Sequence, residues 1–113
     1  MAKINSNRKG KEAETEFVNL CKKYGFDKVR RSQQYSGMNE DADADVVGLP
    51  DLYVEVKRVE SLNIGKAIEQ CLRDKKEEDF AIVAHRKNNK PWLITMTFDD
   101  WIEIYKRYLV ARG

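Results

Sequence analysis

The apolar residues of this chain follow two spacings, one typical of helices and the other of strands. Apolar side chains three or four positions apart predict helices over 8–24, 64–72 and 97–109. Alternating or short continuous apolar runs predict five strands, at 26–34, 44–48, 52–58, 80–85 and 92–96. The order α-β-β-β-α-β-β-α predicts one α/β domain over residues 1–113, with a mixed central sheet flanked by helices.

Residues typical of helix ends bound the predicted helices. Gly25 is a natural stop for the first helix, and Asn63 or Ser61 can cap the second. Thr97, with Asp100 three residues later, is a typical start for the third helix. The third helix also has an apolar stripe that we expect to face inward, made of Trp101, Ile104, Tyr105, Tyr108 and Leu109.

The segment DADADVVGLPDLYVEVKR, residues 41–58, is the first candidate for chemistry. A three-residue turn at 49–51 would place Asp45 opposite Glu55 in an antiparallel hairpin. Because side chains alternate between the two faces of a strand, six residues then share one face. These are Asp43, Asp45, Val47, Tyr53, Glu55 and Lys57. Like charges opposite one another destabilise a sheet, so structure alone does not favour this arrangement.

Asp45 and Glu55 can hold a divalent cation between them if they stand opposite one another. Opposed residues have Cβ atoms about 4.5 to 5.5 Å apart, which suits two carboxylates that bind one cation. Lys57 lies two residues beyond Glu55 on the same face and can stabilise charge that develops on a phosphate. The alternative is an exposed hairpin in which Lys57 neutralises the pair. Asp51 lies about 13 Å from Glu55 along the strand, so we assign it to the turn.

Glu14 is a further acidic candidate, because it falls inside the apolar arc of the first predicted helix. An acid on the buried side of a helix needs a partner, and a metal ion would be one. The alternative is a position at the rim of the arc, from which Glu14 reaches solvent or a nearby lysine.

Composition and charge narrow the choice of partners and compartment. The net charge is only +2, but the first 31 residues hold nine basic and four acidic side chains, whereas acids crowd into 40–45. A basic surface beside an acidic pocket suits an enzyme that acts on a phosphodiester backbone, although a solvated charged surface explains it equally well. Cys21 and Cys71 lie on apolar helix faces and are expected as free thiols. The absence of any predicted signal peptide or membrane span favours a cytoplasmic protein.

Two stretches of the sequence resemble a known family. KGKEAETEFVNLCKKYGF, followed by DADVVGLPDLYVEVKR, is similar to the PD-(D/E)XK nuclease superfamily and, within it, to small Holliday junction resolvase-like endonucleases and their phage-encoded relatives. The resemblance implies a restriction-endonuclease-like α-β-β-β-α-β core, to which this chain adds a strand and a C-terminal helix. It also implies magnesium-dependent cleavage of DNA, with manganese able to substitute, commonly by a homodimer. A phage-encoded protein would act in the host cytoplasm.

The resemblance also assigns roles to particular residues. Glu14, Asp45 and Glu55 match the acidic metal-binding positions, and Lys57 matches the catalytic lysine. Basic and polar residues that flank the proposed pocket are candidates for binding DNA, although a solvated role is as likely for any one of them. These candidates are Lys9, Lys11, Arg30, Arg31, Ser32, Gln33 and Arg86. Gln70 and His85 have possible site roles, but an exposed helix position and a strand end explain them at least as well.

The function expected from the sequence is therefore hydrolysis of DNA by a metal-dependent, structure-selective endonuclease. The sequence does not specify whether the DNA substrate is a four-way junction, a flap, a nick or a plain duplex. A DNA-binding accessory protein on the same fold, with little or no cleavage, is the alternative. A protein-interaction domain that needs no cation is a third reading, and it predicts no affinity for DNA at low salt.

Overall fold

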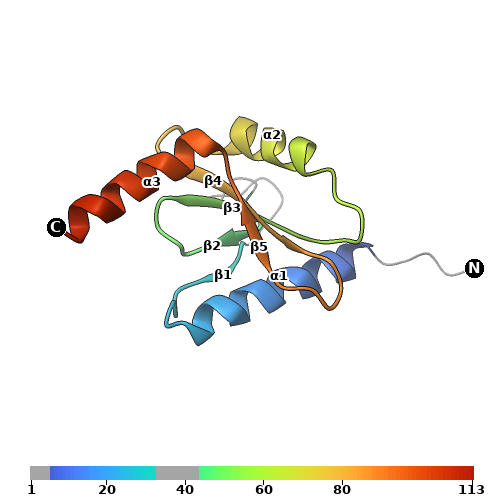
Figure 1. Cartoon of the computed structure of the whole chain (residues 1–113). Helices are drawn as coiled ribbons and strands as arrows, with labels where there is room; N and C mark the ends of the chain where they lie inside the picture. Colours follow the sequence, from blue (N-terminus) through green and yellow to red (C-terminus); the bar gives the residue numbers. More distant parts are fainter. Residues whose placement is uncertain (1–5, 33–43) are drawn as a thin grey trace, which may run out of the picture.

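The computed structural model describes residues 6–32 and 44–113, and three helices and five strands lie in this part of the chain (Figure 1). Their bounds are α1 Ser6–Lys23, β1 Arg30–Arg31, β2 Val46–Val47, β3 Leu52–Arg58, α2 Ile64–Asp74, β4 Phe80–Arg86, β5 Leu93–Thr95 and α3 Phe98–Ala111. The order of elements and the α/β class predicted from the sequence are confirmed. No helix in the described ranges is both long and apolar enough to cross a membrane.

The five strands form one mixed sheet in the order β1-β2-β3-β4-β5. All neighbours are antiparallel except β3 and β4, which run parallel and are joined by α2. Val46 pairs with Val54, which is the register that a turn at 49–51 requires. The predicted hairpin register is therefore confirmed, and the catalytic candidates on β3 occupy a central strand.

The first strand is much shorter than the sequence predicted. Within the described residues of the predicted strand 26–34, which end at Ser32, only Arg30 and Arg31 pair with β2, which itself has two residues; Gln33 and Gln34 lie outside the described residues. Residues before Arg30 form turns, and Phe26 is 52% exposed, whereas Val29 alone enters the core. A strand can extend only as far as its partner offers backbone groups, so the short β2 limits β1.

Helices α1 and α2 cover opposite faces of the sheet (Figure 1). The side chains between α1 and the sheet form one core cluster: Ala13, Phe17, Val18, Val29, Val46, Val54, Val56, Ile82 and Ala84. The side chains on the α2 side form a second cluster: Ala44, Tyr53, Ala67, Cys71, Ala81 and Val83. The alternation along β3 therefore matches the sequence prediction, with Val54 and Val56 on one face and Tyr53 on the other. Both cysteines are free thiols, as expected.

Local contacts explain where the elements begin and turn. The side chain of Asn63 accepts a hydrogen bond from the Lys66 N–H at the start of α2, and Thr97 does the same for α3. Gly48 has φ +101°, and a Cβ on it would overlap the backbone of Lys28. Only glycine fits where the segment before β1 passes this close to the hairpin.

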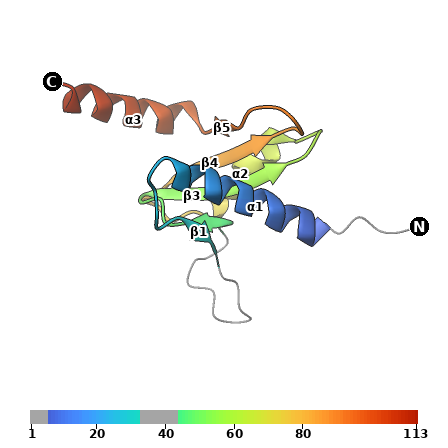
Figure 2. The ribbon, with the colours of Figure 1, turned by 90° about the horizontal axis from the view of Figure 1, so that it is seen from below.

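The third helix contradicts the prediction that its apolar stripe faces inward. The exposed fractions are 45% for Trp101, 42% for Tyr105 and 59% for Tyr108, and Ile104 and Leu109 are exposed as well. Figure 2 shows α3 running away from the sheet beyond β5. Because α1 and α2 already cover the two faces of the sheet, α3 has no face left on which to bury its stripe.

Candidate active site

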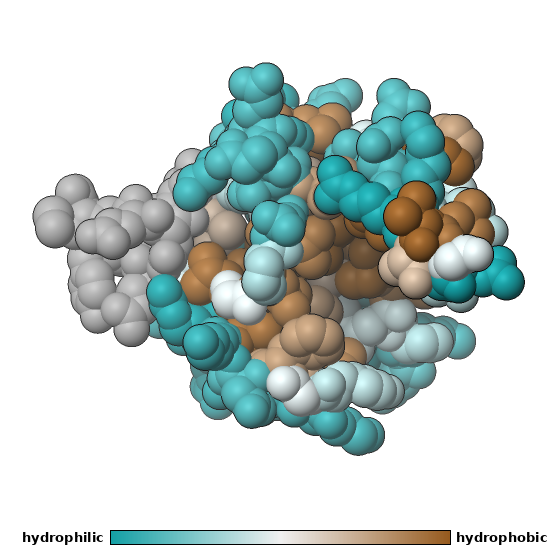
Figure 3. Space-filling view, turned by 90° about the vertical axis from the view of Figure 1, so that its left-hand side faces the viewer, coloured by the Kyte–Doolittle hydropathy of each residue, from teal (hydrophilic) through white to brown (hydrophobic). Residues whose placement is uncertain are grey.

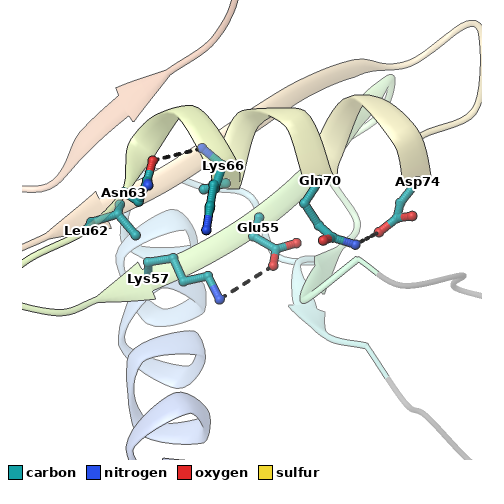
Figure 4. A pocket seen from close by; sticks show the side chains of 8 residues that line it. Glu55, Lys57, Leu62, Asn63, Lys66, Gln70 and Asp74 are labelled. Atoms are coloured by element: carbon teal, nitrogen blue, oxygen red, sulfur yellow. Dashed lines mark hydrogen bonds and ion pairs between the residues drawn. The ribbon is translucent and has the colours of Figure 1, made fainter.

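Glu55 and Lys57 lie on the α2 side of β3, where the sheet and α2 form an open pocket of about 660 Å³ (Figure 4). They share this side with Tyr53, as the alternation of the strand requires. The lining residues are Glu55, Lys57, Leu62, Asn63, Lys66, Ala67, Gln70 and Asp74. A strand thus supplies an acid and a base to the floor of the pocket, and a helix supplies its polar wall.

Glu55 is a carboxylate with little access to solvent. Its side chain is 14% exposed, and its Oε2 atom lies 3.7 Å from Nζ of Lys57. Burial, together with the negative charge of Asp45, raises the pKa of Glu55 to about 7, although Lys57 acts in the opposite direction. A single lysine at this distance therefore leaves much of the cost of the buried charge uncompensated.

Asp45 lies immediately before β2 and bonds to the edge of β3. Its Oδ2 atom accepts a hydrogen bond of 2.9 Å from the Val56 N–H, and its own N–H donates to the Val54 carbonyl. Burial raises the pKa of Asp45 to about 6; the Val56 bond and Lys57 lower it, whereas the charge of Glu14 raises it. The hydrogen bond fixes one carboxylate oxygen in place and leaves the other available.

Asp45 and Glu55 together meet part of the requirement for a divalent cation. Glu55 lies on β3 and Asp45 lies immediately before the adjacent strand β2, and burial is the largest cause of the raised pKa of each acid. Within residues 6–32 and 44–113, however, no group of three or more His, Cys, Asp or Glu side chains is arranged to hold a metal ion. Magnesium commonly binds to one or two carboxylates and completes its shell with water and substrate phosphate. The pair fits that mode of binding, but not a cage made entirely of protein ligands.

Glu14 does not join such a group. It projects from α1, and its Oε1 atom lies 3.0 Å from Nε of Arg31, with the Glu14 side chain 19% exposed. The partner that this largely buried acid needs is therefore an arginine on β1. The charge of Glu14 still reaches Asp45. Its role as a metal ligand stays a prediction.

The candidates for DNA binding are scattered rather than gathered at the pocket. Lys9 and Lys11 lie on the first turns of α1, Arg30 is exposed on β1, and the Ser32 N–H donates to the Asp45 carbonyl. Gln33 falls outside the described residues. Two of the candidates are engaged elsewhere, because Arg31 bonds to Glu14 and Arg86 bonds to Glu16 at 2.7 and 3.1 Å.

The polar wall of the pocket comes from α2, and most of it was missed in the sequence. Asn63, Lys66, Gln70 and Asp74 recur every three or four residues, beside the buried positions of the same helix. Figure 4 shows Gln70 bonded to Asp74, at 2.8 Å, with Lys66 above Glu55 and Lys57. The spacing of these polar residues along the helix was a signal that the sequence already contained.

His85 takes the structural role that the sequence favoured. Its Nε2 atom lies 2.8 Å from Oγ1 of Thr95 on the neighbouring strand, and burial lowers the pKa of the imidazole. It pairs with Lys57 across the parallel strands but does not line the pocket of Glu55. Its contact joins the ends of two strands.

Comparison of the chain with protein-family models, with curated proteins and with solved structures gave no match in any of the three. Two acids with raised pKa values can bind a divalent cation, and Lys57 and Lys66 can bind an anionic group beside it. Together these groups suit a substrate that carries phosphate.

Proposed function

We propose that this chain is a divalent-metal-dependent DNA endonuclease of the Holliday junction resolvase-like type. One observation supports the proposal most strongly: two largely buried carboxylates, Asp45 and Glu55, interact electrostatically, and Glu55 lies beside Lys57 at an open pocket. Strongly perturbed acids in a cleft are typical of functional sites, because a structural role alone is better served by neutral or paired groups. The resemblance of residues 9–58 to PD-(D/E)XK nucleases supports the same activity.

In this proposal, the two acids bind the metal ion and Lys57 acts on the phosphate. Asp45, held by the Val56 N–H, and Glu55 bind Mg²⁺, for which Mn²⁺ can substitute. When bound, the ion polarises the phosphoryl oxygen and makes water more acidic. Lys57 stabilises the charge that develops on the phosphate, and Glu14 assists through its charge near Asp45.

DNA would be held by basic side chains at the pocket and on the surface beyond it. Lys66 faces the pocket, and Lys9, Lys11 and Arg30 offer positive charge outside it. Arg31 and Arg86 contribute to this surface only if they leave their glutamate partners, whereas Gln33 and Ser32 would donate hydrogen bonds. The proposal includes action as a homodimer in the cytoplasm, which is the host cytoplasm if the gene belongs to a phage.

A DNA-binding accessory protein with little or no cleavage is the second candidate. The specific observation in its favour is the ion pair between Glu14 and Arg31, which takes the third acid away from the other two. A two-carboxylate site without that acid could bind a cation only loosely. On this reading, the chain would bind DNA through its basic residues and leave cleavage to another protein.

The proposal predicts metal-dependent cleavage that depends on Asp45 and Lys57. The experiment uses a labelled four-way junction, a flap, a linear duplex and a single strand, with Mg²⁺, Mn²⁺ or EDTA. Asp45→Asn and Lys57→Ala should each reduce cleavage by at least roughly 100-fold, because each removes a charge at the reacting phosphate. Asp51→Asn is the matched control: it is the same chemical change on the same hairpin, at an exposed turn position with φ +68°, which asparagine tolerates.

Paired symmetric cuts confined to the junction would identify a resolvase. If wild type binds these DNAs but cuts none of them with either metal, the accessory role replaces the catalytic one. If cleavage persists in EDTA or survives Asp45→Asn, it does not come from this site.

A further inference from the structure

The C-terminal helix α3 carries large apolar side chains that the described part of the chain leaves exposed. All of its 14 residues lie in the described part of the chain, and none is buried. Its contact with the rest of the molecule includes Arg107, whose guanidinium lies 5.2 Å from the centre of the Phe80 ring. Figure 3, which faces the end of the molecule where α3 ends, shows apolar side chains in brown open to solvent among polar ones.

The aromatic side chains of α3 form one continuous series. The ring centres of Phe98 and Trp101 are 5.8 Å apart, those of Trp101 and Tyr105 are 5.3 Å apart, and those of Tyr105 and Tyr108 are 6.1 Å apart. The steps of three, four and three residues place these rings along one stripe of the helix. That is the spacing of the contact stripe in a pair of helices that pack side by side.

Exposed apolar side chains also lie on the strand that precedes α3. Leu93 and Ile94 on β5 are 56% and 52% exposed, and β5 is the last strand of the sheet before α3. Scattered apolar residues on a surface need no explanation, but a contiguous patch rimmed by polar groups marks an interaction site. The patch therefore needs a partner.

Charges on α3 favour a second copy of the same helix as that partner. The first half carries Asp99, Asp100 and Glu103, the second half carries Lys106 and Arg107, and Arg112 is the C-cap residue. Two copies that run antiparallel bring the acidic half of each helix beside the basic half of the other, and they also oppose their helix dipoles. A parallel pair would place like charges together. The distribution therefore selects both the partner and its direction.

We propose that α3 is the interface of a homodimer, in which the α3 helices of two copies pack antiparallel about a two-fold axis near the middle of the helix. Such an interface is self-complementary, because each patch meets its own equivalent. Trp101, Tyr105 and Tyr108 are the buried anchors of the interface. The inference does not depend on the chain being a nuclease.

The oligomeric state of the full chain in solution tests the interface. Sedimentation of wild type up to about 100 µM should give twice the mass of one chain. The double variant Trp101→Ala/Tyr108→Ala should raise the dissociation constant by at least about 100-fold, because aromatic anchors dominate such interfaces. Val110→Ala is the control, since Val110 is 81% exposed and lies outside the aromatic series. Far-ultraviolet circular dichroism checks that the variants fold. We expect them to fold, because none of the residues of α3 is buried in the single chain.

The direction of packing is measured with spin labels on a Cys21→Ser background. In an antiparallel pair crossing near residue 103, labels at Glu103→Cys lie close together, whereas labels at Arg112→Cys lie about 27 Å apart along the helix axis. Short distances at both positions would mean a parallel pair and overturn the arrangement.

A wild type that stays monomeric, or a dimer that the double variant leaves intact, would overturn the interface itself. Binding of the monomer to lipid vesicles through the same residues would assign the stripe to a membrane surface instead. Cleavage is measured separately: a monomer that cleaves DNA would overturn only the dimer, and a dimer that cleaves none would overturn only the nuclease.

Discussion

The two faces of strand β3 handle their acids in opposite ways. On the α1 side, Arg58 lies 3.6 Å from Glu12 and 3.5 Å from Glu16, and Arg86 bonds to Glu16 at 2.7 Å. The hydrogen bond from Arg86 holds the pKa of Glu16 below its ordinary value. On the α2 side, burial raises the pKa values of Asp45 and Glu55 to about 6 and about 7.

The acids on the α1 side form ion pairs that support the fold, whereas the acids on the α2 side are suited to bind a ligand. Arginine offers several donors to a carboxylate, and the α1 side uses two arginines around Glu16. The α2 side offers Lys57, which lies 3.7 Å from Glu55 and is 41% exposed. A fold that needed only stability could have paired the acids on both sides. The unmatched charge on one side is therefore the feature to test.

The largest expected difference between the two faces is that removing one acid from each face changes the free energy of unfolding in opposite directions. At pH 8 without divalent metal, Glu55→Gln should stabilise the protein by about 2 kcal/mol, because it removes a buried charge that costs free energy. Glu16→Gln, the same substitution on the other face, should destabilise it by about 1 kcal/mol, a modest figure because Glu16 is 37% exposed. Urea unfolding measures both values. Destabilisation by both variants would mean that the two faces are alike.

A divalent cation should change the stability of the α2 face in a pH-dependent way. Because the pKa values of Asp45 and Glu55 are raised on folding, the folded protein holds more protons than the unfolded chain between about pH 4 and pH 7. Their contribution to stability therefore falls as pH rises through this range, and the loss is complete above about pH 7. A bound cation compensates the ionised pair, so it should stabilise most where both acids are ionised.

Millimolar Mg²⁺ should accordingly raise Tm by about 5 °C at pH 8 and by much less at pH 5. Thermal unfolding followed by circular dichroism measures the shift, with Ca²⁺ as a second hard cation for comparison. Asp45→Asn should abolish the response to Mg²⁺, whereas Glu16→Gln should keep it. An equal shift at both pH values, or one that persists in Asp45→Asn, would place the cation elsewhere.

The same contrast explains which parts of the molecule were predictable from the sequence. The hairpin register followed from local rules, since the length of the turn and the alternation on either side of it fix Val46 opposite Val54. The bond from Val56 to Asp45 did not, because it arises only where the short β2 stops pairing. The ion pair of Glu14 with Arg31 joins a helix to a strand, so it required their packing in three dimensions.

The third helix shows another limit of sequence patterns. Its periodicity correctly predicted an amphipathic helix, and Thr97 caps it as expected. The pattern of one chain cannot tell whether the cover for an apolar stripe comes from the same chain or from another molecule. Exposure of Trp101 and Tyr108 in the folded chain was therefore a finding that only the structure could supply.

The smallest expected effect is on DNA binding by Lys66, which lies on the pocket wall formed by α2. Lys66 faces the space beside Glu55 and Lys57, so it can hold a phosphate of the DNA without taking part in the chemical step (Figure 4). Lys66→Ala should raise KM for DNA roughly 3- to 10-fold and leave kcat within about 2-fold, as expected when binding is lost equally in the ground and transition states. Lys76→Ala, an exposed lysine beyond the end of α2, is the control for general loss of positive charge.

Salt dependence of DNA binding adds a second readout for Lys66. Loss of one phosphate contact should lower the slope of log affinity against log salt by about 1 for Lys66→Ala and leave it unchanged for Lys76→Ala. Equal effects of the two variants would mean that DNA responds to net charge and does not lie over the pocket. A fall in kcat as large as that of Lys57→Ala would instead place Lys66 at the reacting phosphate, and the α2 wall would then belong to the catalytic groups.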